Sequence, residues 1–400
     1  MPIRNKSALA VLCFGIAFLA YWGFAQALGK AHTSDAAYFN LLADAFLHGR
    51  LHLVNPPTTI DLAFFNGRWY VPFPPLPALL MLPWVAAAGV DAVNTVVFNA
   101  AFAAANVALI FLILSALSQH KFTALNTADN LWLTLLFGLG SVHWYMATQG
   151  SVWFIAQICT VTFVALAVLI TLQRGPAWMA GLALGLAVAA RPNVALSFPL
   201  LLGIVAMDGT SSIDWRRILR WGAQAAVPIL LVAAALLAYN QARFHNPLDF
   251  GYANAEVNPR LAADLAEYGQ FSPHYIPRNL RAMLFALPVW DAEARRPTAD
   301  GDGLSLLITT PALVYLVWAR KRNPLTLGAW TALGLLVIPL LLYYNTGWWQ
   351  FGYRFSLDFM LPVMVLLANA LSSPLLRLAR LLILAGVAVN LYGVLWWHLL

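Results

Sequence analysis

The sequence predicts an all-α fold: a polytopic membrane helix bundle of about eleven transmembrane helices, with juxtamembrane or re-entrant helices on its outer surface. Of the 400 residues, 61% are hydrophobic and 10% are charged, against about 25% charged in a typical soluble domain. The mean hydropathy is +0.73. A soluble core cannot absorb so much apolar sequence at this length, so we expect most of the chain to lie in lipid.

The first apolar span, residues 7–29, follows a basic N-terminus and resembles a signal peptide. Its length of about 20 residues exceeds that of a typical signal-peptide hydrophobic region, and no small-residue cleavage site precedes Lys30, so we expect an uncleaved anchor. Cys13 and Cys159 fall inside apolar spans. This placement predicts neither a disulfide nor a metal site built on thiols.

Ten further apolar spans follow along the chain, at 92–117, 130–147, 153–172, 177–190, 193–207, 222–241, 304–319, 325–343, 355–371 and 381–399. The stretch 73–90 is also apolar but contains four prolines. Because proline interrupts the hydrogen-bond ladder that lipid demands, we expect this stretch to be re-entrant or to lie at the outer surface.

Basic residues set the expected orientation. If 73–90 does not cross, the N-terminus and the basic clusters at 216–220 and 320–322 lie in the cytoplasm, as the positive-inside rule favours. The net charge of +7 then reflects cytoplasmic loops, and we predict no nucleic-acid partner. Residues 1–400 form a single integral membrane domain in this scheme. Two long segments, 30–91 and 242–303, lie outside and carry most of the acidic residues.

The first outer segment contains the principal catalytic candidate, Asp35. It precedes residues 38–48, in which apolar side chains recur at helical spacing, as in a helix that lies flat on a membrane. Asp35 is either the cap of this helix or a catalytic carboxylate. In the second outer segment, 259–269 and 276–287 suit short helices opened by a proline.

Three arginines, Arg191, Arg243 and Arg354, occur at outer membrane edges. A charge at the bilayer boundary is costly unless it snorkels or has a partner. The arginines either snorkel to lipid headgroups or converge on an anionic group, for which a phosphate suits the guanidinium geometry. Asp358, one turn beyond Arg354, is a candidate ion-pair partner for it.

Several polar and aromatic residues are candidates for a substrate pocket. Gln149, Trp153 and Gln157 repeat every four residues, which indicates either a cavity lining or interhelical hydrogen bonds. Tyr70 follows Trp69 in an aromatic, proline-rich stretch whose rings are either interfacial anchors or part of the site. Tyr38 begins the surface helix that follows Asp35.

Residues 34–39, 47–50, 67–77 and the 181–192 hairpin together resemble the C-type glycosyltransferase superfamily, in particular bacterial family-39-like members of the protein mannosyltransferase and aminoarabinose transferase type. The resemblance covers roughly the N-terminal half. It implies an integral protein of the bacterial inner membrane that takes a sugar from a polyprenyl-phosphate carrier. The sugar passes, by an inverting displacement, to a glycan, lipid or protein acceptor on the periplasmic side.

The resemblance implies that Asp35 is the general base or helps a divalent metal, and that Arg191, Arg243 and Arg354 contact the donor phosphate. Two departures disfavour a metal. Ala36 stands where many members have a second acidic residue, and Gln149-Gly150-Ser151 stands where many have an acid in the second outer loop. No cofactor is otherwise predicted.

Two other function classes remain open. An O-antigen polymerase or ligase also works outside the cytoplasm but relies on arginines and a histidine of a large outer loop, here His245 or His274. A lipid or solute transporter would need no carboxylate base. No glycine-rich phosphate loop or zinc-protease motif is present in the sequence.

Overall fold

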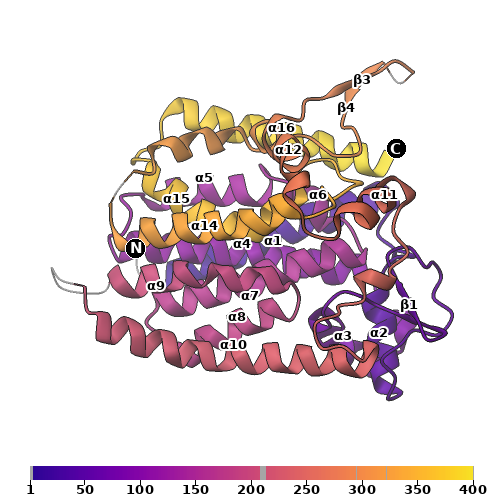
Figure 1. The fold of residues 1–400 in the computed structure, drawn as a ribbon. Coiled ribbons are helices and arrows are strands. Elements are labelled where there is room, and N and C mark those ends of the chain that lie inside the picture. Colours follow the sequence, from indigo (N-terminus) through magenta and orange to yellow (C-terminus); the bar gives the residue numbers. More distant parts are fainter. Residues whose placement is uncertain (1–2, 208–212, 294, 321, 400) are drawn as a thin grey trace.

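A computed structural model describes residues 3–207, 213–293, 295–320 and 322–399 (Figure 1). The predicted all-α membrane bundle is confirmed. Within the described residues, strands are limited to two short hairpins. Six described helices are long and apolar enough to cross a membrane. They are α1 (Ile3–Ala27), α4 (Thr95–Gln119), α7 (Val152–Leu172), α10 (Trp215–Phe244), α14 (Pro324–Leu342) and α16 (Arg377–Leu399).

The other expected spans are shorter or broken helices. The 130–147 span divides into α5 and α6, and the 193–207 and 355–371 spans each begin as a 3₁₀ helix before an α-helix. The expected number of about eleven crossings therefore stays a prediction. These elements are α5 (Thr127–Gly138), α6 (His143–Ala147), α8 (Ala177–Val188), η2 (Pro192–Ser197), α9 (Phe198–Met207), α13 (Leu306–Thr309), η6 (Pro311–Trp318), η7 (Arg354–Phe359) and α15 (Met360–Ala370).

Residues 30–91 fold into short elements gathered at one end of the bundle (Figure 1, lower right). The proline-rich stretch forms α3, which is too short to appear among the candidate spans and packs against α2. The helix expected after Asp35 is present as α2, which buries Phe39, Leu42 and Ala45 and leaves Leu47 exposed. The elements are α2 (Tyr38–Leu47), β1 (Ala63–Phe65), β2 (Arg68–Tyr70), α3 (Leu76–Ala88) and η1 (Val90–Ala92).

Residues 242–303 also form short elements. The expected helix 259–269 is present as α11, which opens at Pro259 as predicted. The expected helix 276–287 is a short α-helix, α12, followed by a π-helical turn. The elements are η3 (Tyr252–Asn254), α11 (Pro259–Tyr268), η4 (Pro273–Tyr275), α12 (Ile276–Leu280), the π-helical turn η5 (Arg281–Phe285), β3 (Val289–Asp291) and β4 (Arg296–Thr298).

Glycines allow helices of the bundle to approach closely. A Cβ atom on Gly181 of α8 would lie 2.0 Å from the carbonyl oxygen of Ala225 in α10. One on Gly203 of α9 would lie 3.1 Å from the Cα of Gly328 in α14. Lipid provides no hydrophobic driving force between helices, so such close contacts contribute the van der Waals attraction that holds a membrane bundle together.

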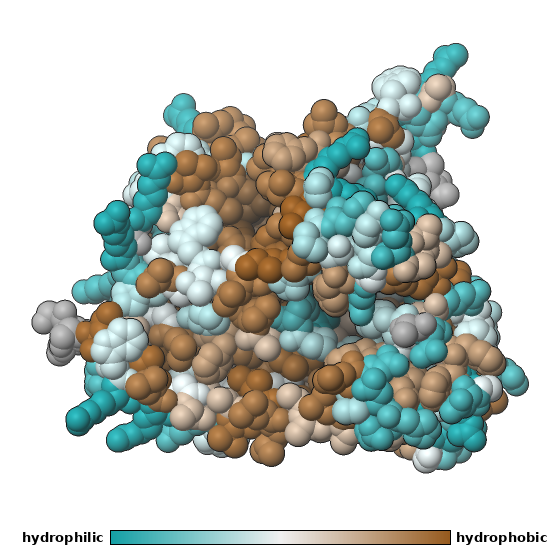
Figure 2. Space-filling view, viewed as in Figure 1, coloured by the Kyte–Doolittle hydropathy of each residue, from teal (hydrophilic) through white to brown (hydrophobic). Residues whose placement is uncertain are grey.

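The surface has the polarity of a membrane protein. Figure 2 shows a broad hydrophobic region over the middle of the bundle, with hydrophilic residues at the two ends. On α10, Leu230 and Leu231 are each 66% exposed. Apolar side chains on this scale would be unfavourable in water. The chain is therefore an integral membrane protein.

Candidate active site

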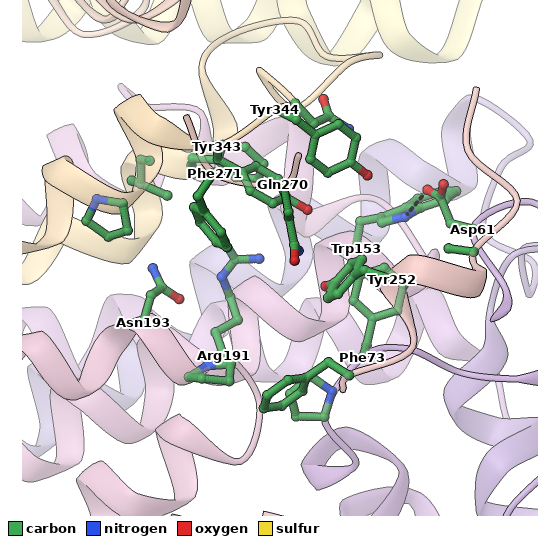
Figure 3. Close-up of a pocket in the computed structure, with 18 of the residues that line it drawn as sticks. Asp61, Phe73, Trp153, Arg191, Asn193, Tyr252, Gln270, Phe271, Tyr343 and Tyr344 are labelled. Carbon is green, nitrogen blue, oxygen red and sulfur yellow. Dashed lines mark hydrogen bonds between the residues drawn. The ribbon is translucent and has the colours of Figure 1, made fainter. Parts of the chain in front are cut away.

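A cavity of about 500 Å³ lies where the two long interhelical segments meet the helix ends (Figure 3). Its walls are rich in aromatic side chains, and they carry two arginines and two carboxylates. Trp153 comes from the first turn of α7, Arg191 precedes η2, and Arg354 begins η7. The other residues that matter for its chemistry are Asp61, Phe73, Asn193, Asp249, Tyr252, Gln270, Phe271, Tyr343, Tyr344 and Phe355.

Asp61 reaches this cavity because the two long segments pair with each other. The backbone N–H of Asp61 donates to the carbonyl of Glu256 at 3.3 Å, and the N–H of Glu256 donates to Leu62 at 3.0 Å. Ala63 and Ala255 form an antiparallel bridge beside them. Asp61 itself has a φ of 57°, a left-handed conformation that Asp tolerates better than most residues.

The Asp61 carboxylate is partly buried and accepts a hydrogen bond from the Trp153 indole N–H at 2.9 Å. Burial raises the pKa of Asp61, while the bond from Trp153 and the positive charge of Arg354 act in the opposite direction. A carboxylate with a raised pKa binds a proton more strongly than an ordinary Asp does, which suits a general base.

Arg354 supplies a cation to the same cavity. Its Nε donates to the carbonyl of Gly347 at 3.0 Å, and its side chain stacks on Phe355. It forms no ion pair with a described residue, although only 7% of it is exposed. Gly347 has a φ of 106°, which glycine adopts without strain. A nearly buried guanidinium with no carboxylate partner favours an anionic ligand.

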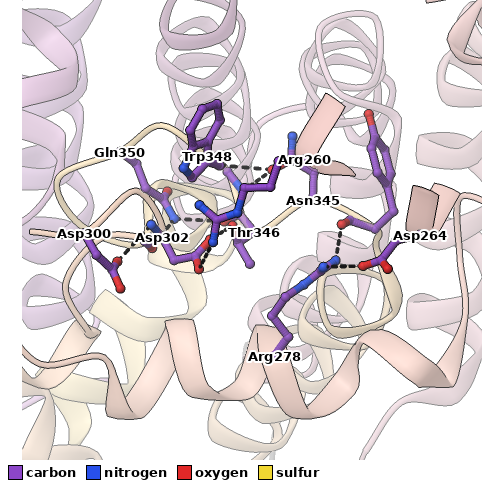
Figure 4. A network of polar contacts seen from close by, with 11 residues as sticks. Arg260, Asp264, Arg278, Asp300, Asp302, Asn345, Thr346, Trp348 and Gln350 are labelled. Atoms are coloured by element: carbon purple, nitrogen blue, oxygen red, sulfur yellow. Dashed lines mark hydrogen bonds and ion pairs between the residues drawn. The ribbon is translucent and has the colours of Figure 1, made fainter. Parts of the chain in front are cut away.

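A polar network holds the loop that carries Gly347 (Figure 4). The Gln350 side-chain oxygen accepts the Arg354 backbone N–H at 2.9 Å, and its amide nitrogen donates to the carbonyl of Asp302 at 2.8 Å. The Asp302 carboxylate accepts bonds from Thr346 and Arg260. The segment 242–303 therefore supports the position of Arg354 through Asp302 and Gln350.

Arg191 is already paired. Its Nη2 donates to the Asp358 carboxylate at 2.7 Å, and Asn193 donates to the same oxygen at 2.8 Å. The expected pairing of Asp358 with Arg354 is wrong. Both residues lie in the 3₁₀ helix η7, where about three residues complete a turn, so positions four apart point in different directions.

The structure does not bring Asp35 together with the arginines. Asp35 is exposed, does not line the cavity, and makes no hydrogen bond to a described residue. It is not the cap of α2 either, because Ala37 occupies that position without a side-chain cap. The carbonyl of Ala36 accepts the N–H of Val152, which fixes this segment against the start of α7.

Three more of the predicted site residues are buried outside the cavity. Arg243 donates to the Val71 carbonyl at 2.6 Å and to Asn240 at 2.7 Å, so it braces the chain between β2 and α3. The Tyr38 hydroxyl donates to the carbonyl of Ile60 at 2.7 Å, which steadies the residue before Asp61. Tyr70 packs against Phe244.

The glutamines behave differently from each other. Gln149 is buried and donates to Thr148 at 3.0 Å, away from the cavity. Gln157 donates to the backbone carbonyl of Arg354 at 3.0 Å. Of the predicted series spaced by four, only Trp153 lines the cavity, while Gln157 supports a residue that does.

Sequence reasoning missed Asp61, Asp249 and the tyrosines at 252, 343 and 344. Tyr252 lies in the short 3₁₀ helix η3 and Tyr344 follows α14, so neither belongs to a long apolar helix that hydropathy would reveal. Burial raises the pKa of both hydroxyls, so they remain protonated hydrogen-bond donors. The position of Asp61 in the first outer segment was the one available signal for it. No cluster of three or more potential metal ligands occurs among the described residues.

No family model and no curated protein matches the sequence. Solved structures do. ArnT from Cupriavidus metallidurans, crystallised with undecaprenyl phosphate, superposes with a TM-score of 0.52 at 14% identity. The match covers 96% of this chain and 60% of ArnT. An oligosaccharyltransferase from Archaeoglobus fulgidus, tethered to an acceptor peptide with an NVT sequon, gives a TM-score of 0.46 at 11% identity, over 98% of this chain and 54% of that one.

The likeness to ArnT concerns the fold, and this chain spans about 60% of the length of ArnT. It extends over nearly all of this chain, including the C-terminal half, for which the sequence resemblance rested on hydropathy. The chain therefore shares the overall fold of ArnT, which agrees with the fold that the sequence resemblance implied.

Proposed function

We propose that this protein is a membrane glycosyltransferase that moves a sugar from a polyprenyl-phosphate carrier to an acceptor. One observation carries the proposal: the Asp61 carboxylate and the unpaired Arg354 guanidinium line the same aromatic cavity. The fold shared with ArnT, whose crystal structure contains undecaprenyl phosphate, supports the class of donor.

The chemistry balances with these groups. Asp61 takes the proton of the acceptor hydroxyl while that oxygen attacks the anomeric carbon of the donor sugar. A new carbon–oxygen bond forms, and the bond between the anomeric carbon and the phosphate oxygen breaks. The electron pair leaves with the polyprenyl phosphate, and attack from the opposite side inverts the anomeric centre.

Arg354 stabilises the charge that grows on the leaving phosphate. A fixed cation in a poorly solvated site needs no reorganisation as the charge develops, so it favours the transition state. Arg191 is in a different position because Asp358 already neutralises it. We assign Arg191 to orienting the phosphate by hydrogen bonding, and Arg354 to stabilising its charge.

We assign the base to Asp61 and not to Asp35. Of these two carboxylates, Asp61 lines the cavity and Asp35 does not, and the positive charge of Arg354 acts on Asp61. Arg243 is not part of this proposal because its two terminal nitrogens are bonded to the protein. The histidines on which an O-antigen polymerase or ligase would depend, His245 and His274, are exposed and do not line the cavity.

The basic residues support a catalytic face outside the cytoplasm. Arg216, Arg217 and Arg220 lie in the first turns of α10, and the last residue of this long helix, Phe244, packs beside Tyr70 near the cavity. At 1.5 Å per residue, the helix is about 45 Å long and spans the bilayer. If the basic end faces the cytoplasm, as the positive-inside rule favours, the cavity opens on the other side.

Asp61→Asn tests the proposal directly. Membranes that contain the full chain are supplied with polyprenyl-phosphate sugars, and transfer to endogenous acceptors is followed by radiolabel. Loss of a general base should slow transfer by about 100-fold or more. Asp35→Asn is the matched control and should keep near-normal transfer.

Other outcomes separate the rival functions. Transfer at the normal rate by Asp61→Asn would remove the carboxylate from the mechanism. If Asp35→Asn alone is inactive, the base is the one the sequence resemblance implied. Movement of a labelled lipid or solute across the bilayer without any transferred sugar would identify a transporter.

A further inference from the structure

A second large groove lies at the end of the bundle away from the aromatic cavity. Its volume is about 1080 Å³, and it runs between α9, the start of α10, the end of η6 and the first turns of α14. The lining is mostly apolar and includes Leu202, Ala206 and Leu327. It shares no lining residue with the candidate active site.

The floor of the groove is firmly packed. Gly203 of α9 and Gly328 of α14 face each other so closely that a Cβ on Gly328 would lie 2.9 Å from the Cα of Gly203 and 2.5 Å from the Pro199 carbonyl oxygen. The two helices cannot close over the groove by moving nearer to each other. The groove is thus a fixed feature of the helix packing.

The polar rim of the groove is positively charged. Arg320 and Arg322 line it and are exposed, and neither forms an ion pair with a described residue. The Arg320 Nε donates to the carbonyl of Val317 at 2.8 Å, which fixes its side chain at the rim. No described Asp or Glu lines the groove. An anion at this rim would meet two cations and no acidic residue in the lining.

The N-terminus of α14 opens into the same place. Asn323 caps the helix by accepting the N–H of Thr326, and Pro324 occupies the first turn. A helix N-terminus favours negative charge through its backbone N–H groups and dipole. The Thr326 side chain, 3% exposed, lines the groove, and its hydroxyl has no hydrogen-bond partner among the described residues.

We propose that this groove binds an anionic glycerophospholipid of the surrounding membrane leaflet. Arg320, Arg322 and the α14 N-terminus hold the phosphate, and the Thr326 hydroxyl hydrogen-bonds to an ester or glycerol oxygen. One acyl chain lies on the apolar wall formed by α9 and α14. Trp215 and Trp330, which are 64% and 40% exposed, flank the lipid at headgroup level, where tryptophan is favoured.

The lining determines which occupant fits. A free phosphate ion would use the rim and leave the apolar wall uncovered. A neutral phospholipid would cover the wall, but its own headgroup cation would lie near the two arginines. A lipid with a net negative headgroup fits both the charged rim and the apolar wall. Its phosphate pairs with the guanidinium groups of the rim, and its acyl chain covers the wall.

Native mass spectrometry of the full chain tests this assignment. The detergent-purified protein is incubated with mixed micelles of phosphatidylglycerol and phosphatidylcholine in equal amounts. We expect one retained phosphatidylglycerol per protein in clear excess over phosphatidylcholine. The double variant Arg320→Gln/Arg322→Gln should lower that retention about tenfold or more, since it removes two charge-assisted contacts. Thr326→Val keeps the side-chain shape and should lower retention by a smaller factor.

The double variant Arg216→Gln/Arg220→Gln is the matched control. These arginines are exposed on α10 at the same end of the bundle, do not line the groove, and carry the same total charge. Unchanged retention in the control with loss in the groove variant establishes the site. Equal loss in both variants would mean a diffuse charge effect and would overturn it, as would equal retention of the two lipids by the wild type.

Displacement of the lipid by inorganic phosphate alone would also overturn the proposal, because the apolar wall would then contribute nothing. The readout is bound lipid and not sugar transfer. The result is therefore independent of whether the protein is a glycosyltransferase.

Discussion

The Trp153 indole N–H and the Asp61 carboxylate are 2.9 Å apart and join the first turn of α7 to the segment between α2 and β1. This bond has two consequences. It fixes the carboxylate at the wall of the aromatic cavity. It also stabilises the ionised form of Asp61, so it lowers the pKa of a carboxylate whose burial raises the pKa. The pH at which Asp61 loses its activity as a base should therefore depend on the hydrogen bond from Trp153.

The pH dependence of transfer follows from this bond. A general base works only when it is deprotonated, so transfer should be full above the pKa of Asp61 and fall as the pH drops through it. Burial raises that pKa, so the loss should occur at a higher pH than for an ordinary Asp. Trp153→Phe removes a bond that lowers the pKa, so the acid limb of the rate profile should move to still higher pH. An acid limb at the same pH in wild type and variant would contradict this role.

Arg354 should be required for the chemical step. Arg354→Gln removes the only guanidinium in the cavity that lacks an ion-pair partner among the described residues, and we expect kcat to fall by about 100- to 1000-fold. Arg354→Lys keeps the charge but loses the planar fork, so it should recover part of the rate. Initial rates over a range of lipid-linked sugar concentrations separate kcat from KM.

The control for Arg354 is Arg68→Gln. Arg68 is an exposed arginine of β2 that does not line the cavity. Its substitution should leave both constants near the wild-type values. A rise in KM alone for Arg354→Gln would show that Arg354 binds the donor without stabilising the leaving group.

Arg191 and Asp358 should be coupled in stability. Asp358 is 3% exposed, and the Nη2 of Arg191 lies 2.7 Å from its carboxylate. Asp358→Asn leaves a desolvated cation without its partner and should cost about 3–5 kcal/mol of unfolding free energy. Adding Arg191→Gln should restore much of that loss. Thermal unfolding in detergent measures the cycle, and purely additive effects would show that the pair is not coupled.

Helix packing can be tested at Gly181. Gly181→Val places side-chain atoms where the Ala225 carbonyl of α10 already lies, so α8 and α10 must separate. We expect a loss of about 1–3 kcal/mol or more in unfolding free energy. Gly334→Val is the control, because nothing lies within 4 Å of a Cβ built at Gly334 in α14. Equal shifts of the unfolding midpoint in the two variants would argue against close α8–α10 packing.

The local sequence was sufficient to predict many elements of this fold. The apolar spans that became α1, α4, α7, α10, α14 and α16 could be recognised because a bilayer demands long apolar runs, whatever the neighbours are. The prolines in the first turns of α11 and α12 marked helix starts for an equally local reason. Broken spans were harder, because the glycines at 138 and 140 lie inside a continuous apolar run that predicts one span.

The candidate site was only partly predictable. Trp153, Arg191 and Arg354 were recognised because polar or aromatic residues at membrane edges are conspicuous. The sequence resemblance ranked Asp35 first, and no local feature singled out Asp61, which is another isolated carboxylate of the same outer segment. Their difference arises from the pairing of residues 61–63 with residues 255–256, which are nearly 200 residues distant in sequence. Composition by itself therefore determined that the chain is a membrane bundle. Only the tertiary structure decided that the Asp61 carboxylate and the Arg354 guanidinium share a cavity, because long-range pairing of this kind leaves no periodic pattern in the sequence.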